Sequence, residues 1–155
     1  MKVLHININD YMGAGLCCYR ISKSLQKIGV DSKILVVNKR SNDNTIFSVG
    51  KIQALCSRAE SKFLGGLPFN ISEKGYLYKK GRQNKTIYTL PVSNINLSKH
   101  FLVEDADIIH LHWVDGLIDY PSFFENVDKP IVWTLHDEGL FYGVAHYEKD
   151  VFHND

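Results

Sequence analysis

The chain has 155 residues, of which 45% are hydrophobic, and this is enough for a single domain, residues 1–155, with a core of its own. Its 18 Lys and Arg residues against 17 Asp and Glu residues give a formal net charge of +1, without the basic footprint that binding to a nucleic-acid backbone requires. No secretory signal and no apolar run of membrane-spanning length is visible, so we expect a cytoplasmic protein.

The first forty residues predict a βαβ unit. Residues 2–8 form a short apolar run typical of a buried parallel strand, and residues 9–15 supply a turn. Apolar residues then recur at helical spacing over residues 16–28, with Gly29 as the C-cap. A second strand follows at residues 32–37. A unit of this kind makes a parallel sheet with a right-handed crossover.

The three cysteines, Cys17, Cys18 and Cys56, cannot all pair with one another. The first two are neighbours in the predicted helix, where a mutual disulfide would be strained. Reduced thiols fit this pattern better and agree with a cytosolic protein.

The middle of the chain carries weaker signals. Residues 51–64 predict a helix, and residues 75–90 have apolar positions separated by basic ones, which indicates irregular or short extended structure. The apolar segment 63–69 and the basic segment 79–82 would suit peripheral contact with an anionic membrane, although a solvated basic loop is the simpler explanation.

The last third again alternates strand and helix. Residues 107–112 and 130–136 predict strands, and residues 120–127 predict a short helix with Asp119 as its N-cap. We therefore expect an α/β fold, a Rossmann-like doubly wound parallel sheet with helices on both faces.

The first candidate site is the turn at residues 10–15, where Gly13 and Gly15 precede the predicted helix. Backbone N–H groups at such a turn attract phosphate or a sugar hydroxyl. Glycine in this place also serves tight chain reversal alone, and the two interpretations have about equal weight.

The second candidate is the pair His110 and His112, which lie two residues apart on a strand and so point to the same face. Two imidazoles in this arrangement could hold a metal ion, with His136 as a third ligand of a small zinc hydrolase. Hydrogen-bonded, half-buried histidines are the more economical interpretation, and we predict no metal.

The third candidate follows the last predicted strand, where His136 is succeeded by Asp137 and Glu138. Ligand sites of open α/β sheets lie at the carboxyl ends of strands, so this segment is the best candidate for chemistry. The alternative is that His136 and Asp137 cap the next helix or order the loop.

Two segments together resemble the N-terminal domain of family 4 glycosyltransferases, which have the GT-B fold and build bacterial surface polysaccharides. They are DIIHLHW at residues 107–113 and KPIVWTLHDEGLFYGVAHY at residues 129–147. The resemblance implies the acceptor-side half of a retaining enzyme that transfers a sugar from a nucleotide-sugar donor to a saccharide or lipid-linked acceptor. It also implies a cytoplasmic protein that can lie peripherally at the inner face of the plasma membrane and needs no cofactor besides its nucleotide-sugar co-substrate.

The resemblance also assigns roles to residues. It implies that His136 contacts the donor sugar or supports the developing charge at its anomeric carbon. Further substrate contacts are implied for Gly13, Gly15, His110, His112, Asp137 and Glu138. Several positions depart from the family pattern. Met12 stands in place of its first glycine, Leu16 in place of an arginine, and Ala145 in place of a cysteine.

In such enzymes a second, C-terminal domain binds the nucleotide, and nothing in this sequence resembles it. We therefore expect the chain to be inactive alone and to need that domain in cis or in trans. A competing hypothesis is a non-catalytic Rossmann-like binding module or a subunit of a split enzyme. Nucleic acid is not an expected partner.

Overall fold

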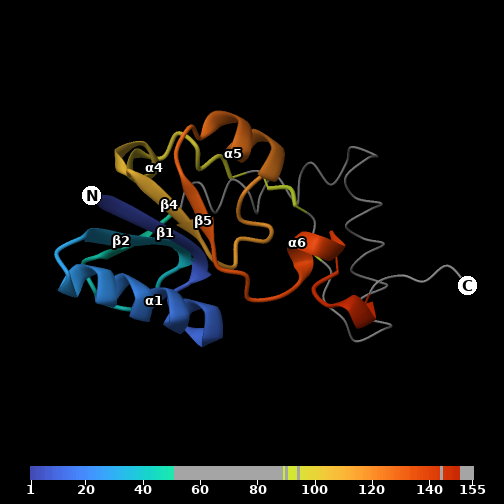
Figure 1. Ribbon diagram of the computed structural model, residues 1–155, viewed down its shortest axis with the longest axis horizontal. Helices are drawn as coiled ribbons and strands as arrows, with labels where there is room; N and C mark the ends of the chain where they lie inside the picture. The colour runs from blue at the N-terminus through green and yellow to red at the C-terminus, as the bar shows by residue number, and fades with distance from the viewer. Residues whose placement is uncertain (51–88, 90, 94, 144, 151–155) are drawn as a thin grey trace, which may run out of the picture.

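The computed structural model describes residues 1–50, 89, 91–93, 95–143 and 145–150. These residues contain a five-stranded, all-parallel sheet with the order β3-β2-β1-β4-β5 (Figure 1). It is the order of the first five strands of a Rossmann sheet. The α/β prediction with a parallel sheet is confirmed. The strands are β1 (Lys2–Asn9), β2 (Asp31–Asn38), β3 (Ile46–Ser48), β4 (Ile108–Leu111) and β5 (Ile131–Trp133).

The described helices lie on both sides of this sheet. Figure 1 shows α1 (Met12–Lys27) on one face and α4 (Phe101–Asp105) and α5 (Tyr120–Asn126) on the other. The short helix α6 (Gly139–Tyr142) and a 3-10 turn at Glu148–Asp150 lie beyond the carboxyl ends of the strands.

Apolar residues of the strands form two layers, one on each face of the sheet. The larger layer joins the sheet to α4 and α5, and it buries Ile6 and Leu111 completely together with Phe123 of α5. The smaller layer joins Cys18 of α1 to β2 and β3. Burial on both faces explains why the central strands have nearly continuous apolar sequences.

The end of α1 agrees with its predicted cap. Gly29 adopts a φ of +83°, and the N–H groups of Gly29 and Val30 donate to the carbonyls of Gln26 and Leu25. This is the Schellman pattern, and glycine suits it because a left-handed backbone is strained for residues with a Cβ.

The start of α1 differs from the prediction, because the helix begins at Met12 and not at Leu16. The expected turn is thus reduced to two residues, Asp10 and Tyr11, and both site glycines lie inside the first helical turn. Met12 adopts a φ of +65° to make this short connection. A glycine would take that conformation without strain.

In the second half, the Asp119 N-cap is confirmed, since its Oδ2 accepts from the backbone N–H of Ser122 at 3.2 Å. β4 and β5 are shorter than predicted. The sequence did not predict β3 or α4, because elements of three and five residues are too short for a period to show.

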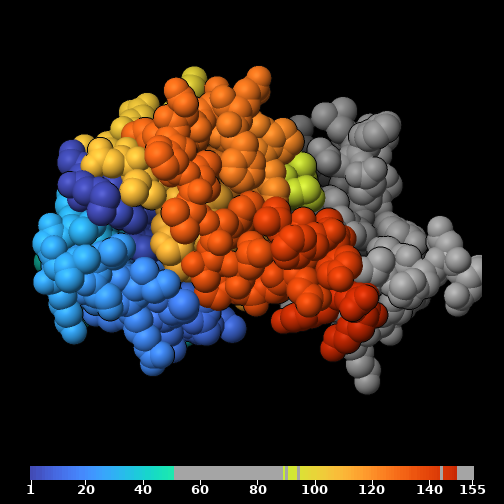
Figure 2. All heavy atoms as spheres, viewed as in Figure 1, coloured from blue at the N-terminus to red at the C-terminus, as the bar shows by residue number. Residues whose placement is uncertain are grey.

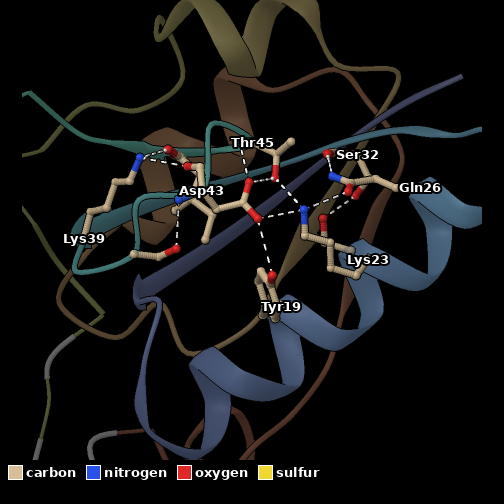
Figure 3. Close-up of polar contacts among 10 residues, drawn as sticks. Tyr19, Lys23, Gln26, Ser32, Lys39, Asp43 and Thr45 are labelled. Atoms are coloured by element: carbon tan, nitrogen blue, oxygen red, sulfur yellow. Dashed lines mark hydrogen bonds and ion pairs between the residues drawn. The ribbon is translucent and has the colours of Figure 1, made fainter.

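A carboxylate fastens α1 to the loop between β2 and β3 (Figure 3). Asp43 pairs with Lys23 of α1 at 2.7 Å and accepts from both the N–H and the hydroxyl of Thr45 at 2.8 and 2.7 Å. The hydrogen bond from Lys23, followed by those from Thr45, holds the pKa of Asp43 well below its usual range. These contacts keep the helix aligned with the sheet.

Some predictions fall on residues that the structure does not describe. They are the helix at residues 51–64, all but one residue of segment 75–90, the candidate membrane segments 63–69 and 79–82, and Cys56. Cys17 and Cys18 are free thiols. Among the described helices, none has both the length and the apolar character needed to cross a bilayer.

Candidate functional site

Four histidines gather at the carboxyl end of the sheet. His5 of β1 is the register neighbour of His110 of β4, so their rings lie side by side on the α1 face, with centroids 4.8 Å apart. His112 follows two residues later on the same face, and its ring lies 4.3 Å from that of His110. His136, in the loop after β5, stacks against His112 at 5.4 Å. We call these four residues the histidine cluster.

Three members of the histidine cluster form a hydrogen-bonded chain. Nδ1 of His5 lies 3.1 Å from Nε2 of His112, and Nδ1 of His112 lies 3.2 Å from Nε2 of His136. His110 stands aside from this chain, because its Nε2 contacts Oγ1 of Thr134 at 2.7 Å. The chain therefore runs from a fully buried ring on the central strand to a partly exposed ring at the surface.

In this hydrogen-bonded chain, the buried ring of His5 determines which nitrogen of His136 carries the proton. Nε2 of His5 has no hydrogen-bond partner among the described residues. Buried N–H groups without an acceptor are rarer than buried acceptors without a donor, so we assign no proton to Nε2 of His5. His5 then donates from Nδ1 to His112, His112 donates from Nδ1 to His136, and the proton of His136 stays on its own Nδ1.

Burial keeps these rings neutral. Desolvation, reinforced by repulsion from His110, lowers the pKa of His5 to about 3. Desolvation, reinforced by repulsion from the neighbouring histidines, lowers the pKa of His112 to about 2. The pKa of His136 is also lowered, mainly by desolvation, although the nearby Asp137 carboxylate acts in the opposite direction. At neutral pH, His136 is thus a neutral hydrogen-bond donor.

His136 lines a cleft that encloses about 250 Å³, part of it open solvent. The side chains of Trp113 and Trp133 form aromatic walls of this cleft, and Leu140 of α6 lies on its rim. Phe141, Tyr142 and Tyr147 are exposed and do not line it. The remaining lining residues are His112, Asp115, Leu135 and Asp137. In Figure 2, residues from β5 onward (orange to red) occupy the middle of the face shown.

The two carboxylates after His136 have different surroundings. Asp137 lines the cleft, accepts from the N–H of Gly139 at 3.0 Å through Oδ1, and contacts Nδ1 of His146 at 2.6 Å through Oδ2. Glu138 is exposed and accepts from the N–H of Glu148 at 2.9 Å. Asp137 thus belongs to the cleft, whereas Glu138 orders the segment that follows α6.

The predicted glycines do not line this cleft. Gly15 is buried where α1 crosses the end of β1, and a Cβ built there would lie 2.7 Å from the carbonyl oxygen of Asn9. Gly13 has open space around it. The close approach explains Gly15 by packing alone, without a ligand.

We therefore expect Gly15→Ala to lower the free energy of unfolding by about 1–3 kcal/mol, because backbone atoms cannot yield to the added methyl group. Gly13→Ala is the matched control, and we expect it to raise the free energy of unfolding by about 0.5–1 kcal/mol through helix propensity. Urea unfolding measures both. Equal effects of the two substitutions would contradict the packing role of Gly15.

The zinc hypothesis with His110, His112 and His136 does not match the geometry. Among the described residues, the histidines whose ring nitrogens converge are His5, His110 and His112, and His136 is not one of that set. His5, His112 and His136 already contact one another through hydrogen bonds within the histidine cluster. The economical interpretation, hydrogen-bonded histidines, agrees with these contacts.

Sequence reasoning missed several residues that the fold brings to the site: His5, Asp115, Trp133 and His146. A polar residue inside the apolar first strand was a usable signal for His5. Asp115 and His146 gave no such signal, because 30 residues separate them and only the loops around the cleft bring them together. No protein-family model, curated protein or solved structure matches this chain.

Proposed function

We propose that this chain is the acceptor-side, N-terminal domain of a retaining glycosyltransferase of the GT-B fold, with its sheet doubly wound. It would transfer a sugar from a nucleotide-sugar donor to a saccharide or lipid-linked acceptor. One observation carries the proposal: His136 lines a cleft at the carboxyl end of a parallel sheet, where it ends a hydrogen-bonded chain that starts at two buried histidines.

The chemistry of glycosyl transfer fits such a group. Positive charge develops at the anomeric carbon as the bond to the leaving group breaks, and a cationic imidazole would repel it. A neutral His136 instead offers a hydrogen bond to a sugar hydroxyl, and the Asp137 carboxylate beside it favours the developing charge. The cluster fixes the ring, so little reorganisation accompanies the reaction.

The lining of the cleft includes two residues of a kind that saccharide sites use. Trp113 and Trp133 both lie there, and indole rings can stack on the C–H faces of a pyranose. Both indole N–H groups are already engaged, with Asp115 Oδ2 at 3.2 Å and the carbonyl of His112 at 2.9 Å, so the rings are held in fixed orientations. In this proposal the nucleotide of the donor is bound by a second Rossmann-like domain.

Two measurements test the function. The first is a titration of the chain with glucose, galactose, mannose and N-acetylglucosamine and their disaccharides, observed through the imidazole NMR signals of His136. The second mixes the chain with a donor-domain polypeptide of a family 4 glycosyltransferase and a nucleotide sugar, and measures transfer. We expect saccharide-dependent shifts at His136 and transfer only in the mixture.

The outcomes separate the two candidate functions. Saccharide binding without transfer in any mixture would favour a non-catalytic binding module. Absence of both binding and transfer in a folded chain would contradict the glycosyltransferase proposal. Transfer that persists when His136 is replaced would contradict the role given to that residue.

A further inference from the structure

A second group of polar side chains meets at one side of the cleft, apart from the histidine cluster. It consists of Asp115, Asp137 and His146, from three separate loops. Nδ1 of His146 lies 2.6 Å from Oδ2 of Asp137 and 3.6 Å from Oδ2 of Asp115. The ligand-type atoms of all three residues lie within 4.8 Å of one another. His146 is 6% exposed, while the two aspartates line the cleft.

Outside partners hold each of these side chains by its other polar atom. Oδ1 of Asp115 accepts from the hydroxyl of Tyr120 at 2.5 Å, and Oδ1 of Asp137 accepts from the N–H of Gly139 at 3.0 Å. Nε2 of His146 contacts the hydroxyl of Thr89 at 2.9 Å. Oδ2 of each carboxylate and Nδ1 of the imidazole are the atoms that converge. Among them, Oδ2 of Asp137 and Nδ1 of His146 contact each other, and Oδ2 of Asp115 also accepts from the indole N–H of Trp113 at 3.2 Å. In metal sites, hydrogen bonds to the ligand atoms that do not contact the ion typically hold the ligands in orientation.

We propose that Asp115, Asp137 and His146 bind a divalent transition-metal cation, of the class of Mn²⁺ or Zn²⁺. One imidazole and two carboxylates suit such ions, and three protein ligands leave further positions open to water or a substrate oxygen. The cation would neutralise two carboxylates that now lie on either side of one imidazole. The cleft provides the path of entry.

Binding requires only a small rearrangement. Without metal, Nδ1–H of His146 donates to Asp137 and Nε2 accepts from the hydroxyl of Thr89. With metal, the proton moves to Nε2, which donates to Thr89, and Nδ1 becomes a ligand. Ligand atoms at about 2.1 Å from an octahedral ion lie about 3 Å apart, so the 2.6 Å contact opens by a few tenths of an ångström.

This inference goes beyond the proposed function, since glycosyl transfer as described above needs no ion. The test is therefore a binding measurement on the untagged chain. Mn²⁺ and Zn²⁺ are titrated separately into metal-free protein at pH 7.5 and followed by calorimetry. Imidazole NMR signals are recorded at low Mn²⁺, which broadens the resonances of nearby nuclei.

We expect one ion per chain and selective broadening of the His146 signals in the unmodified protein. Asp115→Asn should weaken binding at least about 100-fold, and Tyr120→Phe should weaken it about 10-fold through loss of orientation. Asp128→Asn, which makes the same charge change at an exposed carboxylate, should leave affinity unchanged.

Three results would overturn the proposal. They are no binding up to millimolar metal by the folded protein, equal binding by the Asp115→Asn chain, and Mn²⁺ broadening confined to His5, His110 and His112. The NMR result needs no variant, so a substitution that prevents folding does not remove the test.

Discussion

Replacing His136 with alanine is expected to lower the turnover number of sugar transfer about 100- to 1,000-fold in a mixture with a donor domain. Removal of one preorganised hydrogen-bond donor from an active site has this size of effect in other enzymes. The Michaelis constant for the acceptor should change much less, because in this proposal His136 contacts the donor sugar and not the acceptor. Steady-state transfer rates at varied acceptor concentration measure both quantities.

The matched variant is His136→Gln, whose side-chain amide retains an N–H donor. We expect it to recover part of the lost rate. His5→Leu tests the positioning of His136 from a distance, because it frees His112 from its fixed proton arrangement without contact to the cleft. Its readout is the ¹⁵N chemical shift of His136, which reports the nitrogen that holds the proton. An unchanged ¹⁵N chemical shift would contradict the idea that His5 and His112 determine which nitrogen of His136 holds the proton.

Acid is expected to destabilise the protein well before its carboxylates are neutralised. His5 and His112 have pKa values of about 3 and about 2 in the folded chain, against an ordinary value of 6.5. The contribution of these two neutral histidines to the free energy of unfolding is complete above pH 6.5. It is lost as pH falls, because only the unfolded chain then takes up protons at these side chains. Each such group contributes about 1.4 kcal/mol per pH unit, so the loss by pH 4.5 is on the order of 5 kcal/mol.

Such a loss is comparable to the whole stability of many domains. Urea midpoints at pH 7.5, 6.5, 5.5 and 4.5 measure it, in a window where most carboxylates stay ionised in both states. The double variant His5→Leu/His112→Leu should reduce the dependence of the urea midpoint on pH. Midpoints of the unmodified chain that coincide at pH 6.5 and 4.5 would contradict the prediction, as would NMR titration of either imidazole in that range.

Local sequence was a good guide to the main elements. The apolar run at residues 2–8 predicted β1, and the Gly29 cap and the Asp119 cap predicted where α1 ends and where α5 begins. Each of these signals depends on residues close together in the chain, whose backbone preferences act whatever the surroundings are. The short elements β3 and α4 were missed, since pairing and packing with distant residues stabilise them.

The start of α1 shows how tertiary context overrides a local pattern. The sequence predicted a seven-residue turn in which Gly13 and Gly15 serve either a ligand or tight chain reversal, with about equal weight. The structure extends the helix to Met12 instead, because Gly15 allows α1 to approach Asn9 closely. Gly15 therefore has a packing role, whereas Gly13 has open space around it.

The sequence by itself determined that the chain has an α/β fold with a parallel sheet, and that His110, His112, His136 and Asp137 lie at the carboxyl ends of its strands. These conclusions follow from periodicity and caps, which are local. Only the tertiary structure decided that His5 joins His112 and His136 in one hydrogen-bonded chain and that Asp115, Asp137 and His146 converge. Strand register and loop packing set those distances, and both depend on contacts between residues far apart in the sequence.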